Sequence, residues 1–412
     1  MFCDLNLLKE QTQKKRGSRV LIANEKNKIS MHCILASLYF LMLPLTISTN
    51  STSASFLKIA TIPIAAYFVI SFVFYKKEFN INMVDIALAL YTMTTVIAVF
   101  VDPWEYTIKM VIGYFLNTAL YICLSVISYN ETEIKVFEYV QVILLIMVTI
   151  LALSSDETHN DRNTLVIFGQ QSDPNYFVGF FILPLVVTLK KIFESRFRII
   201  YVIVVFMSFY AIMRSGSRGG ALAVIVTIIA FSLIYPEKIK TKMTVLACFL
   251  GFMVVAWLVF SPMLSENIIE RMTVEAVVES KGTNRADRWA SMINEIKNSS
   301  WEVIFGRGIE AKHTVFLAGK EYAEVAHNHI LQVMYDQGII GLIVFIFLIS
   351  SCFMRCIRKR KYISIAIIGM LALSISLTFN PSTKAFWNLI PYAAFVFPKE
   401  KEEISQINEK GE

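Results

Sequence analysis

The sequence predicts an all-α, polytopic integral membrane protein with about 12 transmembrane helices and one large extracytoplasmic loop. Long unbroken apolar runs are the first observation behind this fold class. The second is composition: 56% of the 412 residues are AVILMFWYC, only 17% are charged, and the mean hydropathy is +0.57. Soluble globular chains carry about a quarter charged residues. In water, this chain would expose too much apolar surface.

Runs of about 15–23 largely apolar residues, bounded by polar or charged residues, mark the predicted spans. They cover 31–48, 56–75, 83–101, 106–128, 136–153, 175–189, 198–213, 219–235, 243–260, 328–353, 362–379 and 385–397. The last run is shorter, and Pro391 interrupts it. Eleven spans plus a re-entrant or tilted segment is therefore the alternative.

The distribution of Lys and Arg predicts the orientation of these spans. With a cytoplasmic N-terminus, most Lys and Arg residues fall on inner segments, and the short outer loops hold only Arg162, Arg214, Arg218 and Lys384. Cytoplasmic loops carry the excess of Lys and Arg, so both termini are predicted to be cytoplasmic. The net charge of +7 is explained as an orientation signal, and no nucleic-acid partner is expected.

This orientation divides the chain into five parts. They are a cytoplasmic N-terminal segment (1–30), transmembrane helices 1–9 (31–260), a large extracytoplasmic loop (261–326), transmembrane helices 10–12 (327–397) and a cytoplasmic tail (398–412). Transporters place charged residues or broken helices inside their spans. Here the main charges inside the spans are Asp85, Lys109 and Asp336. An enzyme or receptor acting at the outer face is favoured over a carrier.

One candidate site opens the eighth span on its outer side, at Arg214-Ser215-Gly216-Ser217-Arg218-Gly219-Gly220. A cation is unfavourable at a helix N-terminus, yet Arg218 stands there. Free backbone N–H groups, the flexible Gly219 and Gly220, and a guanidinium fork together suit an anion. The alternative is that Arg218 only reaches the headgroup phosphates of the lipid.

Two further cations lie in the large outer loop, in the run Asn284-Arg285-Ala286-Asp287-Arg288-Trp289. Arg285 and Arg288 are one helical turn apart, and two cations on one helix face suit a diphosphate. The alternative is a solvated loop in which Asp287 neutralises one of them. An amphipathic helix is predicted here, because apolar residues recur at helical spacing at Trp289, Met292, Ile293 and Ile296.

The third candidate is Ala326-His327-Asn328-His329, directly before the tenth span. A histidine at the membrane edge suits a general base near neutral pH, which makes His327 a candidate. His327 and His329 lack a clear carboxylate partner, so the sequence supports a metal site only weakly. Capping of the following helix by Asn328 is the structural alternative.

A fourth motif, Asp173-Pro174-Asn175, is by itself an ordinary helix start. Ser217-Arg218-Gly219-Gly220 follows it, then Arg285 four residues before Trp289, His327-Asn328 with Gln332, and Gly338-Ile339-Ile340-Gly341. In this order, and with the long outer loop before the histidine, the motifs resemble the O-antigen ligase and polysaccharide polymerase superfamily of bacterial membrane glycosyltransferases. The resemblance covers residues 170–345. Each motif is short, so the ordered set carries the specificity.

The resemblance implies a metal-independent glycosyltransferase without a cofactor, in the bacterial cytoplasmic membrane. Its donor would be a polyprenyl (undecaprenyl) diphosphate-linked oligosaccharide at the outer face of the bilayer. His327 matches the family histidine and would activate the acceptor hydroxyl, while Arg218 and Arg285 would bind the donor diphosphate. Arg288 is a further diphosphate candidate from its spacing alone. The supporting candidates are Asp173, Asn175, Gly219, Gly220, Asn328 and Gln332.

Two activities of the family stay open. A polymerase joins repeat units on the lipid carrier to make capsule, exopolysaccharide or O-antigen, and a ligase moves the finished polymer to lipid A core. The polymerase is favoured, partly because it occurs in more kinds of bacteria, and a flippase and chain-length regulator proteins are its expected protein partners. The alternative from another class is a lipid-linked oligosaccharide flippase. It predicts charged residues inside the spans and no long outer loop, and the sequence shows the reverse.

Overall fold

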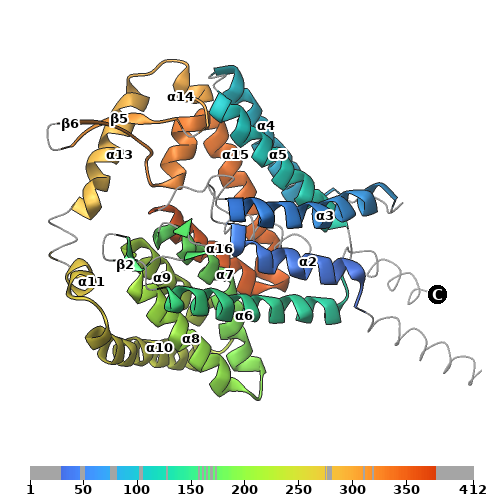
Figure 1. The fold of residues 1–412 in the computed structure, drawn as a ribbon, viewed down its shortest axis with the longest axis vertical. Helices are drawn as coiled ribbons and strands as arrows, with labels where there is room; N and C mark the ends of the chain where they lie inside the picture. Colours follow the sequence, from blue (N-terminus) through green and yellow to red (C-terminus); the bar gives the residue numbers. More distant parts are fainter. Residues whose placement is uncertain are drawn as a thin grey trace, which may run out of the picture.

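The computed structural model is built of helices with three short hairpins (Figure 1). It describes residues 29–46, 52–74, 81–101, 105–126, 129–155, 174–273, 275, 281–309, 311–317 and 320–376, together with four two-residue strands between 158 and 171. The predicted run at 385–397 and Asp173 lie outside these residues, as do the two terminal segments 1–28 and 377–412.

The helices follow the predicted apolar runs closely. They are α2 (Met31–Met42), α3 (Thr52–Phe74), α4 (Met83–Val101), α5 (Glu105–Val126), α6 (Glu131–Ser154), α7 (Pro174–Glu194), α8 (Arg198–Arg214), α9 (Arg218–Ile234), α10 (Ile239–Phe260), α11 (Glu266–Arg271), α13 (Lys281–Lys297), α14 (Glu302–Phe305), α15 (His329–Lys359) and α16 (Lys361–Ser374). Two 3-10 turns lie at Pro44–Thr46 and Ser261–Met263. The helix predicted around Trp289 is confirmed as α13.

The hairpins were not expected from the sequence. They are antiparallel pairs of β1 (Thr158–His159) with β2 (Arg162–Asn163), β3 (Val166–Ile167) with β4 (Gln170–Gln171), and β5 (His313–Leu317) with β6 (Lys320–Glu324). The first two lie between the predicted spans 136–153 and 175–189, and the third lies in the large loop 261–326. In the β5–β6 hairpin, His313 pairs with Glu324 and Leu317 with Lys320. The last of these strands therefore ends three residues before His327.

Five helical segments within the described residues are long and apolar enough to cross a membrane. They are Met83–Val101, Glu131–Ser154, Pro174–Glu194, Ile239–Met263 and His329–Arg358. Shorter apolar helices, among them α9 and α16, pack between them. The helical membrane class is therefore confirmed, while the count of twelve spans stays a prediction.

The centre of the molecule is α7, which packs against α6, α8, α9 and α16. Val178, Phe181 and Val186 on α7 are fully buried. Helices α9 and α16 approach closely, because a Cβ added at Gly369 would lie only 2.1 Å from Oγ1 of Thr227. Small residues permit such contacts between membrane helices. This packing fixes the outer end of α9, where Arg218 stands.

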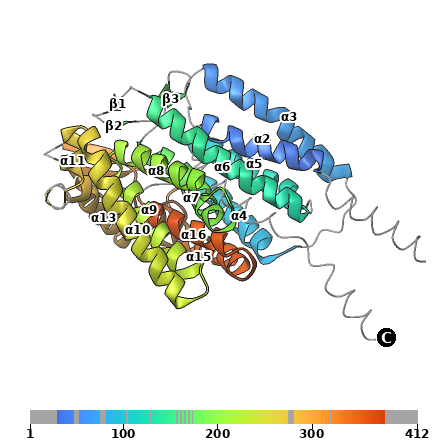
Figure 2. The same ribbon diagram turned by 90° about the horizontal axis from the view of Figure 1, so that it is seen from below.

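The outward face of α10 shows the opposite pattern. Leu250, Val254 and Leu258, spaced four residues apart, are 59%, 59% and 65% exposed. An apolar stripe of this kind is stable in a lipid environment and costly in water. Figures 1 and 2 both place α8 and α10 along one flank of the bundle, so this flank is expected to face lipid.

The elements of the outer segments gather at one side of the molecule. In Figure 1, α11, α13 and the strands β5 and β6 lie at the left, where α10 ends and α11 begins. Helix α13 packs against β5, α14 and α15, and α14 packs against α15 and α4. Residues 281–324 thus form a layer over one end of the helix bundle.

The predicted tenth span is broken at Gly338. This residue has φ 66° and ψ −167°, a conformation that only glycine adopts readily. Residues 329–337 form a short helix that folds back on the longer part, 339–359, because the ring of His329 lies 5.0 Å from that of Phe345. At the break, the carbonyl oxygens of Tyr335 and Asp336 accept hydrogen bonds from the amides of residues 307 and 308 at 3.0 and 3.1 Å. The turn Phe305-Gly306-Arg307-Gly308 therefore completes the broken helix.

Replacing Gly338 by alanine is expected to unfold this junction. A Cβ there would lie 2.2 Å from the carbonyl oxygen of Ile304, and the cost should exceed about 3 kcal/mol. Gly251→Ala on α10 is the matched control, since a Cβ at Gly251 meets nothing within 4 Å. Size-exclusion chromatography after heating should show that the Gly338→Ala protein loses its folded peak at a lower temperature than the Gly251→Ala protein. Equal stability of both variants would contradict the proposed strain at Gly338.

Cysteine labelling checks the predicted orientation. Asn298 and Glu237 are exposed, and the charge pattern places them on the outer and inner sides. In a variant with Cys248 replaced by serine, a membrane-impermeant maleimide added to intact cells should label Asn298→Cys and not Glu237→Cys. After lysis, both should react. Labelling of Glu237→Cys in intact cells would reverse the orientation.

Candidate functional site

Two of the predicted motifs meet at the N-terminal end of α9, which the charge pattern predicts to be outside. Ser217 is the N-cap of this helix, and its hydroxyl accepts a hydrogen bond from the amide of Gly220 at 3.0 Å. The same hydroxyl donates to Oδ1 of Asn175 at 2.8 Å, near the start of α7. Asn175 and Ser217 therefore hold the beginnings of α7 and α9 together. Asp173, the other supporting candidate of the first motif, lies outside the described residues.

The two glycines after Arg218 allow close packing at this point. A Cβ at Gly220 would lie 2.8 Å from Cγ2 of Val178 on α7. A Cβ at Gly219 would lie 1.9 Å from Oγ of Ser376 and 3.8 Å from Nη1 of Arg285. The second contact is important, because Arg285 belongs to α13. The outer layer thus reaches back onto the N-terminus of α9.

Arg218 is the first residue of α9, and a main-chain carbonyl anchors its side chain. Its Nε donates to the carbonyl oxygen of Arg271 at 2.5 Å, at the C-terminal end of α11. A cation is favourable at a helix C-terminus. Only one nitrogen of the guanidinium fork is used in this bond.

Arg271 is a third arginine at this place. Its positive charge acts on Arg218. Within the described part of the chain, Nε of Arg271 is buried and has no hydrogen-bond partner. The structure therefore brings Arg218, Arg271 and Arg285 together at the outer end of α9. We call these three residues the arginine cluster.

Arg288 has a different neighbour. Its Nη2 lies 3.6 Å from Oε1 of Glu324, at the end of β6. Oε2 of the same carboxylate lies 3.7 Å from Nε2 of His327. The structure thus places Arg288 on the histidine side of α13, one turn after Arg285. Glu324 connects Arg288 to His327.

His327 is held in an uncommon backbone conformation. Its φ is 48°, and it is the non-glycine residue with positive φ in the part of the chain that the structure describes. Such residues are uncommon and are often found at functional sites. The preceding carbonyl, of Ala326, accepts a hydrogen bond from Nε1 of Trp289 at 2.9 Å. The side chain of His327 is 33% exposed, so a ligand can reach it.

Asn328 and Gln332 support this segment from α15. Oδ1 of Asn328 accepts from the amide of Leu331 at 3.1 Å, so Asn328 is the helix cap that the structural alternative predicted. Oε1 of Gln332 accepts from the amide of Ala326 at 2.8 Å, and its Nε2 donates to Oδ1 of Asp336 at 2.6 Å. Gln332 therefore fixes the main chain next to His327.

His329 does not share the environment of His327. It is 3% exposed, and its ring packs edge-on against Phe345. Among the described residues, His, Cys, Asp and Glu form no group of three or more that could hold a metal ion. His327 and His329 therefore do not form a metal site with a third ligand in this part of the chain.

Trp289 connects the arginine cluster with His327. It lies one helical turn after Arg285 on α13 and contacts Ala326 through its indole N–H. Arg285 in turn lies against Gly219 on α9. One helix thus carries a cation of the cluster and the residue that positions the histidine segment. Helix α13 therefore links the arginine cluster to the segment around His327.

Residues 203–346 match a family model described as O-antigen ligase. This segment belongs to the O-antigen ligase family. The family segment contains the arginine cluster, Glu324 and His327, while Asn175 lies before it. No curated protein matches the chain. The match supports a function of the O-antigen ligase or polymerase type.

Sequence reasoning missed two residues of the O-antigen ligase segment. Arg271 lies in a polar stretch without a recognisable motif, and it meets Arg218 through its own main chain. Glu324 precedes His327 by three residues, but only the β5–β6 hairpin turns its carboxylate toward Arg288 and His327. Recognition of a hairpin before His327 would have indicated Glu324. For Arg271 the sequence offered no comparable signal.

Proposed function

We propose that this chain is a polymerase of cell-surface polysaccharide. It transfers a glycan from a polyprenyl diphosphate-linked donor to a sugar hydroxyl of a lipid-linked repeat unit, at the outer face of the cytoplasmic membrane. The observation that carries this proposal is the arginine cluster, three cations gathered where a helix N-terminus meets the predicted outer surface. Helix N-termini and arginine forks both favour phosphate groups.

The arginine cluster would stabilise the leaving group. In the transfer, the bond between the anomeric carbon and the diphosphate oxygen breaks, and the electron pair leaves with the diphosphate. Negative charge therefore grows on the phosphate oxygens, and preorganised cations lower the energy of that transition state. Planar guanidinium groups can each bind two phosphate oxygens.

His327 would act on the acceptor. The acceptor hydroxyl attacks the anomeric carbon as its proton passes to the imidazole, and a positioned base of this kind contributes about 10²–10⁴-fold. A single displacement inverts the configuration at that carbon. Partial exposure of His327 and its carboxylate neighbour Glu324 support this role. Glu324 would orient the ring, since its Oε2 lies 3.7 Å from Nε2 of His327.

Arg288 was a candidate for diphosphate binding from its spacing to Arg285. Its contact with Glu324 favours a different role, in which Arg288 holds the carboxylate that faces His327. We therefore assign diphosphate binding to the arginine cluster and positioning to Arg288. Arg288→Gln should then lower turnover more than it raises the KM for the donor.

Reconstitution tests the proposal and its alternatives. Purified protein in liposomes would receive lipid-linked oligosaccharide extracted from the source bacterium after deletion of this chain. A polymerase should yield a ladder of lipid-linked polymer from this substrate alone. A ligase would need added lipid A core before product appears, and a flippase would move the oligosaccharide across the bilayer without any change in its length. Either of these last results would replace the proposal.

Transfer should not depend on a divalent metal. The described residues offer no cluster of three ligands, and the arginine cluster can supply the positive charge that metals supply in phosphoryl transfer. Polymer formation in the reconstituted system should therefore persist in EDTA. A loss of product that Mg²⁺ or Mn²⁺ restores would contradict the metal-free mechanism.

A further inference from the structure

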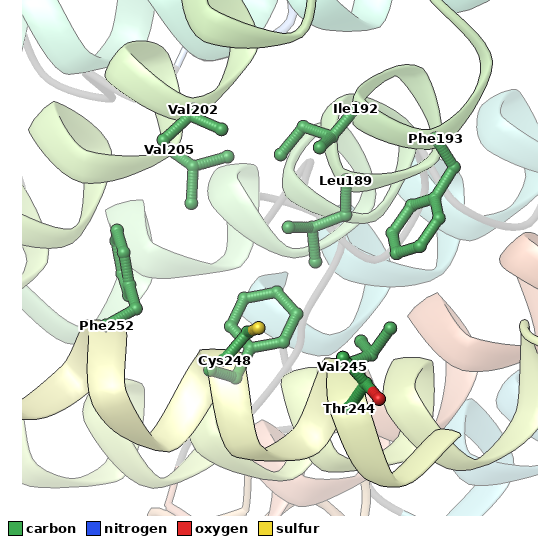
Figure 3. Close-up of a pocket in the computed structure, with 10 residues that line it drawn as sticks. Leu189, Ile192, Phe193, Val202, Val205, Thr244, Val245, Cys248 and Phe252 are labelled. Carbon is green, nitrogen blue, oxygen red and sulfur yellow. The ribbon is translucent and has the colours of Figure 1, made fainter. Parts of the chain in front are cut away.

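A cavity with a volume of about 350 Å³ lies between α7, α8 and α10, away from the arginine cluster (Figure 3). Its walls are almost entirely apolar and include Leu189, Val202, Val205, Val245, Phe249 and Phe252. The cavity volume lies within the range found for pockets that bind small molecules. The cavity borders the α8–α10 flank, on which Val202 is 40% exposed, so an apolar chain can enter from the lipid.

Basic residues continue the cavity walls toward the predicted cytoplasmic side. On α8, Arg198 precedes Val202 by one turn. On α10, Lys240 precedes Thr244 by one turn, and Cys248 follows by another. Residues four apart share a helix face, so each cation stands below a stripe of lining residues. Together they place positive charge at the mouth of an apolar cavity.

These two cations are available to a ligand. Both are exposed, and neither forms an ion pair with another described residue. Arg198 uses its Nε in a hydrogen bond to the carbonyl oxygen of Ser195 at 3.3 Å. The neighbouring carboxylates have partners of their own, Glu194 with Lys190 at 2.9 Å and Glu237 with Lys361 at 3.8 Å.

The helix ends at the mouth also favour an anion. Helices α8 and α10 both begin there, and neither has a side-chain hydrogen bond at its N-cap. Their positive dipole ends therefore lack a side-chain partner at the N-cap and favour a phosphate. The positive charge therefore lies at the mouth of a cavity whose walls suit an apolar chain.

We propose that an anionic phospholipid of the cytoplasmic leaflet occupies this place, with one acyl chain in the cavity and its phosphate at Arg198 and Lys240. The polyprenyl donor is a different ligand. Its diphosphate is proposed to lie at the arginine cluster, at the other end of α8 and α9, and α8 alone is about 25 Å long. A lipid held at Arg198 therefore belongs to the opposite leaflet.

Native mass spectrometry of the full-length protein in detergent tests the proposal. The probes are dioleoyl phosphatidylglycerol, which is anionic, and dioleoyl phosphatidylcholine, which is zwitterionic. One phosphatidylglycerol molecule should be retained in preference to phosphatidylcholine. Each basic side chain near an anionic lipid surface is worth about fivefold in binding. The double variant Arg198→Gln/Lys240→Gln should therefore weaken phosphatidylglycerol binding about 25-fold.

Cys248→Trp fills the cavity and should remove the retained lipid. Leu250→Trp adds the same side chain on the exposed face of α10, and Arg358→Gln removes an exposed cation on α15. Both control variants should bind as the parent protein does. If Cys248→Trp aggregates, the double variant decides, because its substitutions are on the surface.

Unchanged phosphatidylglycerol binding in the double variant would overturn the proposal. Displacement of the retained lipid by added undecaprenyl phosphate would also overturn it, since the cavity would then hold the carrier. Neither readout requires transferase activity. A failure here is therefore distinct from a failure of the proposed polymerase function.

Discussion

Replacement of His327 by asparagine is expected to reduce polymer formation by about 10²–10⁴-fold, while donor binding is retained. Asparagine cannot take a proton from the acceptor hydroxyl. It adopts positive φ more readily than most residues, so the φ of 48° at this position is preserved. Polymer length on gels is the readout, with the amount of protein in the membrane measured in parallel.

Asn328→Ser is the matched control for this substitution. Serine is a good N-cap, so the bond from the amide of Leu331 is replaced and α15 keeps its start. Near-normal polymer is expected from this variant. Normal polymer from His327→Asn would remove His327 from the mechanism and leave a purely structural role for the segment before α15.

The second large effect is expected from Arg218→Lys, with a loss of about 10²-fold in turnover, which is typical for removal of a preorganised donor to a developing anion. Arginine bonds the carbonyl of Arg271 through Nε, and its planar fork is suited to bind phosphate at two points. Lysine has one ammonium group and cannot do both. The initial rate of polymer formation against donor concentration measures the effect.

Arg214→Lys is the control for charge-conserving substitution at the outer face. Arg214 is the last residue of α8, and its Nη1 donates to the carbonyl oxygen of Leu153 at 3.1 Å. A lysine can keep this single bond, so only a small change in rate is expected. Equal losses in Arg218→Lys and Arg214→Lys would show that the arginine fork has no special role at α9.

Arg271→Gln tests the third cation separately. The bond from Arg218 goes to the main-chain carbonyl of Arg271, so the substitution keeps it and removes only the guanidinium group. We expect donor binding to weaken about tenfold in KM. An unchanged KM would show that Arg271 does not contribute to donor binding, which would then depend on Arg218 and Arg285.

Several parts of the candidate site could be placed from the sequence alone. Hydropathy placed Arg218 at the outer start of a span and His327 at the end of the outer loop. Helical spacing identified α13, which carries Arg285. These predictions rest on hydropathy and on helical spacing, which are both local properties of the sequence.

Other parts of the site depend on contacts that leave no local pattern. Arg271 joins Arg218 through a backbone carbonyl, so no side-chain motif marks it. Glu324 reaches His327 because a hairpin returns it there. The apolar run at 328–353 suggested one helix, yet the hydrogen bonds from residues 307 and 308 stabilise a break inside it at Gly338.

The junction between the outer layer and the broken helix has a consequence for evolution. Two of its hydrogen bonds join main-chain groups, from residues 307 and 308 to residues 335 and 336, and a third joins the side chains of Arg307 and Tyr335 at 3.4 Å. The junction constrains two positions, Gly306 and Gly338, whose φ values are 83° and 66°. Gly306 lies against the backbone of residues 336 and 337, and Gly338 lies against that of residues 304 and 305. The two main-chain hydrogen bonds do not depend on the identity of the other side chains. Distant relatives can therefore keep the same architecture with little sequence identity. We expect two glycines, equivalent to Gly306 and Gly338, to be retained in them.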